Sequence, residues 1–286
     1  MMVSSERVFL SKGRKIAARC WNDPSLPPLL ALHGWQDNAA TFDRLAPLLG
    51  DYHIVAMDFA GHGFSDWRAE GMRYHTLDHV DDVLAVVNQL GWTQFALMGH
   101  SMGAGIGTLL AGAMPERVSH FVMIDGLGPY TGTAEESPGI LRTALLEWQE
   151  WAPRDERVFT TREIAVTARQ RGFTPLSTQA AEILCSRSLH EVNGGFIWTM
   201  DRRVRHHSSL RLTESQVLAF LGAIEAPVLL IRAEKSFPVD PVIIDARLAA
   251  IQRVHTLTLP GGHHLHLDES PDAVAAAIRA FLSAAG

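Results

Sequence analysis

The stretch Gly99-His100-Ser101-Met102-Gly103 decides the fold of this chain, because it fits a glycine-x-serine-x-glycine pattern. An apolar run at 94–98 precedes it, as a strand would, and a run of small residues at 102–113 follows it, as a helix would. In this setting the turn is too tight for large side chains, so glycines flank the serine and its hydroxyl is held clear of the backbone. The pattern therefore predicts that Ser101 is a nucleophile.

Strand-like and helix-like segments alternate up to about Asp125 and again from Val228, which favours an α/β fold with a mainly parallel sheet. Between them, residues 126–226 show helical periods instead. We therefore predict a core formed by residues 1–125 and 227–286. The segment 126–226 is expected to be an inserted helical cap that packs on this core.

The spacing of apolar residues predicts the individual elements. In the core we expect strands at 3–10, 15–21, 29–32, 53–59, 94–98, 118–124, 228–231 and 254–259, and helices at 76–90, 102–113, 241–251 and 273–282. In the cap we expect helices at 141–151, 162–171, 178–187 and 213–221. A further helix, capped by Asp37 or Asn38, should be bent or shortened by Pro47.

Composition indicates a soluble globular protein. The 286 residues are 47% hydrophobic and 20% charged, and the formal net charge of −6 gives no electrostatic reason to expect a nucleic-acid partner. No signal-peptide pattern and no apolar window of membrane-spanning length are found, so we expect a cytoplasmic protein that acts on a small molecule. Cys20 and Cys185 are far apart and are expected to be free, buried thiols. The sequence does not indicate an oligomeric state.

A nucleophilic serine needs a base to take its proton. Residues 260–268 carry three histidines on a loop after the last predicted strand, where a mobile base is expected. His263, directly after a glycine pair, is the candidate base, and His264 and His266 are candidates for packing or orienting groups. The histidine spacing does not match a metal-ligand pattern, so neither a metal nor an organic cofactor is expected.

The negative charge that develops on an attacked carbonyl needs hydrogen-bond donors. The turn at 32–36 follows an early strand and can aim the backbone N–H of Trp35 at this oxyanion, while the N–H of Met102 can supply the second donor. Losing one such donor typically costs about 3 kcal/mol of transition-state stabilisation. The indole of Trp35 is then expected to line the pocket.

Together these parts resemble the α/β-hydrolase superfamily over nearly the whole chain. Its histidine-glycine turn corresponds to His33-Gly34, its nucleophile elbow to 99–103 and its histidine loop to Gly262-His263. Residues 32–43, which read Leu-His-Gly-Trp-Gln-Asp-Asn-Ala-Ala-Thr-Phe-Asp, are similar more specifically to the serine-hydrolase-like branch, and residues 261–267 agree with this.

The resemblance leaves the acid of the catalytic triad open. Most relatives carry it after the strand that corresponds to 228–231, in a glycine-glutamate-x-aspartate stretch, but this chain has Ser236 where the aspartate is expected. Some members of the superfamily place the carboxylate after the preceding strand, which corresponds to Asp125. Asp125 is therefore the first candidate. Asp240 and Glu234 stay as alternatives, because a longer loop can bring either near the histidine.

These residues predict a serine hydrolase that cleaves small or medium carboxylic esters through an acyl-enzyme on Ser101. A serine where an aspartate nucleophile would stand argues against the dehalogenases and epoxide hydrolases of the superfamily. Trp148 and Trp198, with Trp35, are candidates to line the substrate site. Two alternatives stay open: a ligand-binding or interaction protein that kept the fold without turnover, and a cofactor-free perhydrolase.

Overall fold

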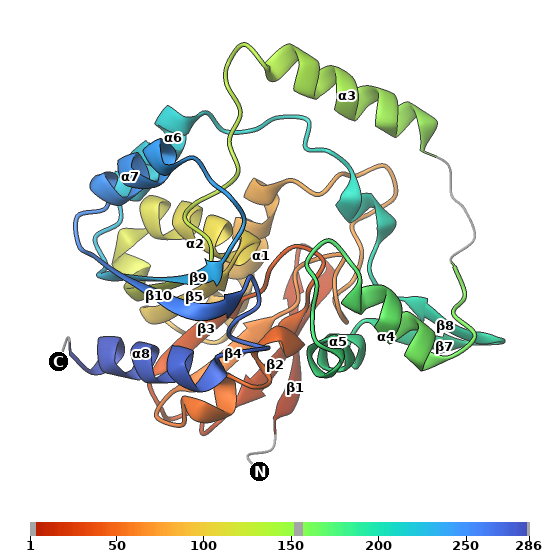
Figure 1. Cartoon of the computed structure of the whole chain (residues 1–286), viewed down its shortest axis with the longest axis horizontal. Helices are drawn as coiled ribbons and strands as arrows, with labels where there is room; N and C mark the ends of the chain where they lie inside the picture. Colours follow the sequence, from red (N-terminus) through yellow and green to blue (C-terminus); the bar gives the residue numbers. More distant parts are fainter. Residues whose placement is uncertain (1–3, 152–156, 285–286) are drawn as a thin grey trace.

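The computed structural model describes residues 4–151 and 157–284. Its centre is an eight-stranded sheet with the order β1-β2-β4-β3-β5-β6-β9-β10 (Figure 1). β2 runs antiparallel to both β1 and β4, and all other neighbouring strands of this sheet are parallel, so the mainly parallel α/β sheet expected from the sequence is confirmed. The strands are β1 (Ser5–Ser11), β2 (Arg14–Trp21), β3 (Pro28–Leu32), β4 (His53–Met57), β5 (Phe95–His100), β6 (Val118–Ile124), β9 (Val228–Lys235) and β10 (Val254–Gly262).

Helices cover both faces of the sheet, because its central strands are apolar on both sides. One buried cluster joins the sheet to α1 (Thr76–Gln89), α2 (Met102–Ala113), α6 (Glu214–Gly222) and α7 (Pro241–Ala250). A second cluster joins the opposite face to the 3-10 turns η1 (Ala39–Phe42) and η2 (Ala46–Leu48) and to α8 (Pro271–Ser283). The parallel strands therefore end at one common edge, where loops can gather functional side chains.

The predicted elements of the core differ from the observed ones mainly at their ends. The helix at 102–113 and the strand at 118–124 have the predicted bounds. The helix expected after Asp37 or Asn38 is instead the two short turns η1 and η2, and the side chain of Asn38 caps the first by accepting from the N–H of Ala40. Pro47 lies in the second turn, where its ring prevents a longer helix.

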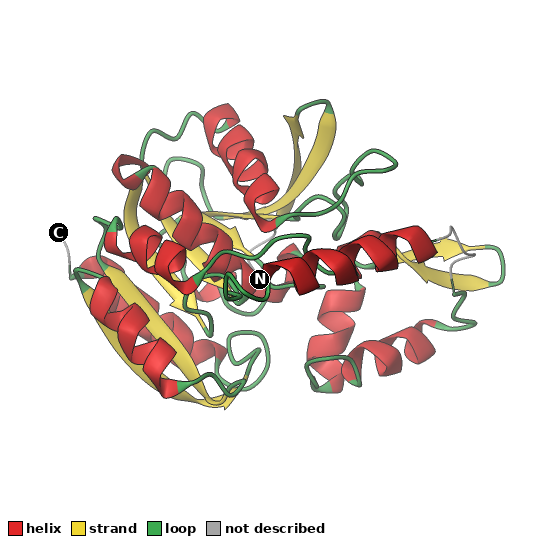
Figure 2. Ribbon diagram, turned by 90° about the horizontal axis from the view of Figure 1, so that it is seen from above, coloured by secondary structure: helices red, strands yellow, loops and turns green. Residues whose placement is uncertain are grey.

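The segment between β6 and α6, which we call the cap below, contains α3 (Ser137–Glu150), α4 (Arg162–Gln170), α5 (Thr178–Cys185) and the 3-10 turn η4 (Arg202–Arg205). It also contains a hairpin, β7 (Leu189–Val192) and β8 (Gly195–Trp198), which the sequence analysis did not predict. In Figures 1 and 2 this hairpin stands apart from the main sheet, at the opposite end of the molecule from the C terminus. The signal for it was present, because Asn193-Gly194 between two short β-prone runs is typical of a hairpin turn.

Helix α6 lies within the range 126–226 that was expected for the cap, but it packs on α2 and α7. Its residues Val217 and Leu221 are fully buried in the same cluster as the sheet. Cys20 and Cys185 are free and buried, as expected. Within the described part of the chain, no helix has both the length and the apolar character that crossing a membrane requires.

Candidate active site

Ser101 lies at the sharp turn between β5 and α2. Its φ of 52° is positive, a conformation that residues with a Cβ adopt only at an energetic cost. Its N–H donates to the carbonyl of Ile124 at 3.0 Å, which ties the turn to β6. A Cβ on Gly99 would lie 2.5 Å from the carbonyl oxygen of Gly103, so the backbone approaches itself too closely for any other residue. The turn thus has the geometry of a nucleophile elbow.

His263 follows the end of β10, and its Nδ1–H donates to Oδ2 of Asp125 at 2.7 Å. Asp125 follows β6 and is 8% exposed. It also accepts from the N–H of Ala233 at 2.9 Å and from Oγ of Ser236 at 2.8 Å. Ser236 is the residue that stands where relatives carry the acid, and it here helps to fix the alternative carboxylate. This geometry leaves Nε2 of His263 available as a proton acceptor.

The two other candidate carboxylates serve elsewhere. Asp240 caps α7 by accepting from the N–H of Val242 at 2.9 Å. Glu234 is exposed near the end of β9. Of the three candidates, the structure joins only Asp125 to His263.

Opposing effects set the pKa values of this pair. Burial has the largest effect on Asp125 and raises its pKa, but hydrogen bonds from His263 and Ala233 more than offset it, so the pKa is lowered overall. Burial lowers the pKa of His263 below its ordinary value of 6.5, although the hydrogen bond to Asp125 acts in the opposite direction. The aspartate is therefore ionised and the histidine neutral at pH 7, which is the state that a general base needs.

The tryptophan turn (residues 33–37) follows β3 on the other side of Ser101. His33 is fully buried within it, where Nδ1–H donates to the carbonyl of Gly34 at 2.7 Å and Nε2 accepts from the N–H of Phe59 at 3.0 Å. One nitrogen of His33 thus bonds within the turn, and the other ties the turn to the loop after β4. The indole of Trp35 donates to the carbonyl of Val204 in the cap at 3.0 Å. Met102 is the first residue of α2, so its N–H lacks a partner one turn earlier in that helix.

A buried polar network joins these loops, and the sequence analysis missed most of it. Asp37 accepts from Nε2–H of His264 at 2.9 Å and from Arg169 of α4 at 2.6 Å. His100, inside the elbow pattern, donates Nε2–H to the carbonyl of His263 at 2.8 Å. His266, placed as a packing or orienting group, hydrogen-bonds Thr41 at 3.0 Å. No periodicity marks such a network, because its members come from four distant segments.

Asp37, His100 and His264 could be mistaken for metal ligands, since their candidate ligand atoms lie within 4.8 Å of one another. Two observations disfavour a cation there. The 2.9 Å contact between Asp37 and His264 is an ordinary hydrogen bond. The guanidinium of Arg169 already occupies the second carboxylate oxygen and would repel a metal ion.

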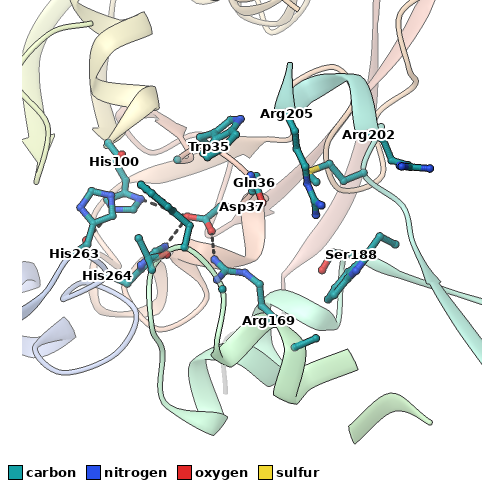
Figure 3. A pocket seen from close by; sticks show the side chains of 18 of the residues that line it. Trp35, Gln36, Asp37, His100, Arg169, Ser188, Arg202, Arg205, His263 and His264 are labelled. Atoms are coloured by element: carbon teal, nitrogen blue, oxygen red, sulfur yellow. Dashed lines mark hydrogen bonds and ion pairs between the residues drawn. The ribbon is translucent and has the colours of Figure 1, made fainter. Parts of the chain in front are cut away.

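Ser101 and His263 line one cavity of about 440 Å³, to which both core loops and the cap contribute. Figure 3 shows side chains of this lining, with His263 and His264 on one side and Arg202 and Arg205 on the other. Aromatic rings follow one another along its lining: Phe237 lies 4.7 Å from His263 between ring centroids, Phe173 lies 5.2 Å from Phe237, and Trp35 lies 5.9 Å from Phe173. The remaining side chains of the lining come mostly from the cap and include Arg157, Phe159, Arg169, Ser188, Trp198, Met200, Arg202 and Arg205.

Of the three tryptophans expected at the substrate site, the structure brings Trp35 and Trp198 to this cavity. The prediction for Trp148 is wrong, because its ring does not line the cavity. It packs instead beneath the guanidinium of Arg73 at 4.4 Å, with the ring of His206 at 5.6 Å. Trp148 was a candidate only as an aromatic residue of the segment expected to form the cap, and no residue of α3 lines this cavity.

A model of the alpha/beta hydrolase fold matches residues 27–270. The chain belongs to the α/β-hydrolase family. It is 33% identical to a serine hydrolase-like protein of Danio rerio over 94% of this chain and 85% of that protein. It is 30% identical to human serine hydrolase-like protein 2 over 93% and 90% of the two chains. These relatives confirm the serine-hydrolase-like branch that the tryptophan turn and the histidine loop indicated.

Solved structures agree with this α/β-hydrolase assignment. A hypothetical protein from Pseudomonas aeruginosa PAO1 is 44% identical, with a TM-score of 0.92 over 97% of this chain and 99% of that one. A thioesterase domain from the curacin biosynthetic pathway is 25% identical, with a TM-score of 0.86 over 97% and 99% of the two chains.

Proposed function

We propose that this α/β-hydrolase is a serine hydrolase that cleaves small or medium carboxylic esters through an acyl-enzyme on Ser101. One observation carries the proposal: Ser101, at a strained elbow, shares a cavity with His263, whose Nδ1–H is bonded to buried Asp125. A nucleophile, a base and a group that orients the base are the three parts that acyl transfer from serine requires.

In the first half-reaction, Nε2 of His263 takes the hydroxyl proton while Oγ of Ser101 attacks the ester carbonyl carbon. The carbonyl oxygen becomes an oxyanion, which the backbone N–H groups of Trp35 and Met102 stabilise. The tetrahedral intermediate then expels the alkoxide, which leaves as the alcohol with the proton from His263. Asp125 keeps its charge throughout and stabilises the imidazolium that forms transiently.

In the second half-reaction, the neutral His263 deprotonates a water molecule, and the hydroxide adds to the acyl carbonyl. Collapse of this second intermediate returns the proton to Oγ of Ser101 and releases the carboxylic acid. The lowered pKa of His263 supports this cycle, because the base is regenerated in neutral form at pH 7.

The cavity supports a substrate of modest size with an apolar part. Its volume of about 440 Å³ lies in the range of small-molecule sites, and rings of Trp35, Phe173 and Phe237 border the approach to His263. The likeness to a thioesterase domain adds thioesters to the acyl donors that should be compared.

The test is hydrolysis of p-nitrophenyl esters of increasing acyl length, alongside matched acyl thioesters, by wild type and Ser101→Ala. We expect turnover by wild type and a loss of about 10⁴-fold or more in kcat for the variant, because the nucleophile is gone. A fluorophosphonate should label wild type but not Ser101→Ala. The control is Ser25→Ala, which changes an exposed loop serine.

Absence of both turnover and labelling in folded wild type would refute the hydrolase proposal and favour a ligand-binding protein. Turnover that survives in Ser101→Ala would refute the role of this serine. Adding peroxide to the same assay separates perhydrolysis from hydrolysis, since both use the same acyl-enzyme.

A further inference from the structure

The carboxylate of Asp37 is the centre of the buried network beside the site. It is 3% exposed. Oδ1 accepts from Arg169 at 2.6 Å, and Oδ2 accepts from His264 at 2.9 Å and faces Nδ1 of His100 at 3.6 Å (Figure 3). Asp37 and His264 lie on loops of the core and His100 ends β5, but Arg169 belongs to α4 of the cap. One carboxylate thus contacts both parts of the molecule.

Asp37 also holds backbone that the proposed reaction uses. Its N–H donates to the carbonyl of Gly34 at 3.2 Å and closes the turn that carries Trp35. His264, its other partner, is the residue after His263. A shift of this carboxylate would therefore move a proposed oxyanion donor and the proposed base together.

A buried carboxylate needs a compensating charge, since leaving one unpaired in the interior is strongly unfavourable. Arg169 supplies that charge at hydrogen-bond distance. Burial acts to raise the pKa of Asp37, but His264, His100 and Arg169 together hold it well below its ordinary value. Among the described residues, this carboxylate also acts to raise the pKa of four histidines of the surrounding loops: His33, His62, His263 and His266.

We propose that Arg169 is a positioning residue for the reaction proposed above. By neutralising Asp37 from the cap, it holds the tryptophan turn and the histidine loop (residues 263–267) in fixed positions relative to each other. This inference rests on the proposed function for its effect on rate. The contact itself also links closure of the cap to the order of the site, because Asp37 keeps its counter-charge only while α4 is seated on the core.

Removing the guanidinium has a specific electrostatic consequence. The nearest group that can replace its charge is His264, which must then take up a proton to become the partner of Asp37. In the intact protein, burial lowers the pKa of His264 to about 4, and Arg169 contributes to that lowering. Without Arg169 the pKa of His264 rises, and a new positive charge appears beside His263.

The first test is Arg169→Ala in the ester assay. We expect kcat to fall by about a hundredfold with KM changed less than about threefold, because displacement of reacting groups by an ångström costs this much in rate. Arg169 lines the cavity, so the space left by its side chain is open to small solutes. Ethylguanidinium at millimolar concentration should restore at least about a tenth of the lost rate, whereas urea, which is similar in shape but uncharged, should not.

Arg169→Lys keeps a positive charge and should retain more activity than Arg169→Ala. Arg171→Ala, which removes an exposed arginine two residues further along, is the matched control. Equal rates in wild type and Arg169→Ala, or a loss that ethylguanidinium and urea repair equally, would overturn the proposal while leaving the hydrolase function standing.

The second test does not depend on turnover. Histidine side-chain NMR titration in the Ser101→Ala background should show His264 moving upward by about one pH unit or more when Arg169→Ala is added. Thermal unfolding of both proteins shows that the comparison is between folded chains. If His264 titrates at the same pH in both, Arg169 does not set the charge balance of Asp37 and the proposal fails. The titration tests the proposal about Arg169 even if the ester assay shows no turnover and the proposed hydrolase function is refuted.

Discussion

The core and the cap are stabilised by different kinds of contact. In the core, strands such as β4 are fully buried, and two apolar clusters fill both sides of the sheet. In the cap, α3 buries a single residue, Ala144, among fourteen. A third, smaller apolar cluster lies around α5. The cap therefore needs other contacts to hold it in place.

Those contacts are made by arginines that are buried, as Arg187 and Arg203 are, or partly buried, as Arg169 is. Arg187, after α5, donates to Asp58 of the core at 2.8 Å and is 2% exposed. Arg203, in η4, donates to the carbonyls of Arg68 and Ala69 in the core. Arg169 completes the set through Asp37. Apolar burial is insensitive to direction, whereas each guanidinium fits one acceptor geometry. The core is thus specified by composition and spacing, and the seating of the cap by a few individual contacts.

The largest predicted effect is a loss of activity on changing Asp125, which lies at the edge of the core sheet. Asp125→Asn should lower kcat by about 10⁴-fold, because the amide no longer fixes the histidine tautomer or stabilises the imidazolium. The fold should persist, since the side chain keeps its shape. The control is Asp240→Asn, which removes a helix cap and should leave kcat within about twofold. A reversed result, with Asp240→Asn inactive and Asp125→Asn active, would show that the acid comes from the other loop.

The next effect tests how the cap is attached. Arg187→Met should lower the free energy of unfolding by about 3–5 kcal/mol, because Asp58 is left buried without its partner. Glu6 is the other acceptor of Arg187 and its side chain is half-exposed. Glu6→Gln should therefore lower the free energy of unfolding by less than about 1 kcal/mol. Urea denaturation followed by circular dichroism measures both.

Hydrogen exchange in Arg187→Met should then show faster opening in 157–205 than in the core strands. Equal stability of Arg187→Met and wild type would refute the view that this arginine seats the cap.

Much of the core could be predicted because its signals are local. Buried parallel strands give short apolar runs, and the elbow pattern fixed the turn between β5 and α2 before any contact was known. Predicting which carboxylate, Asp125 or Asp240, bonds to His263 was harder. The answer depends on which loop reaches His263, and the parallel pairing of β6 with β9, two strands distant in sequence, determines this.

A smaller predicted effect concerns the stability of the folded protein at acidic pH. Burial lowers the pKa of His33 and His264 to about 4 and that of His62 to about 3, below the ordinary 6.5. Between those values and 6.5 the unfolded chain binds more protons than the folded one, so stability is full above pH 6.5 and falls as the pH falls below it. Each such histidine contributes up to about 1.4 kcal/mol per pH unit.

All three histidines belong to the core loops, so the loss should come from the core edge rather than the cap. Urea midpoints should therefore stay level from pH 7.5 to about 6.5 and decrease from there to pH 5, and exposed His190→Gln in the cap should not alter the trend. A flat profile over this range would mean that these imidazoles take up protons in the folded protein as readily as in the unfolded chain.

The cap was harder to predict, because the spacing of residues in an amphipathic helix shows which face is apolar but not which residues that face contacts. Helical spacing placed Trp148 correctly on a helix but could not show that α3 turns that residue to Arg73 and His206. Arg169 carried no signal at all, since an arginine near the end of a helix is ordinarily solvated. The role proposed for it depends on its contact with Asp37, which lies more than a hundred residues away.

The smallest effect separates two tryptophans of the cap that the sequence treated alike. Trp198, on β8, lines the cavity and lies 5.3 Å from Phe159 between ring centroids. Trp198→Ala should raise KM for long acyl esters by about tenfold, because roughly 1–2 kcal/mol of apolar contact is lost, with little change for the acetyl ester. Trp148→Ala should leave both KM values within about twofold, since that ring lies outside the cavity. If Trp148→Ala had the larger effect, the acyl group would bind along α3, and the cavity beside Ser101 would have to accommodate the alcohol instead.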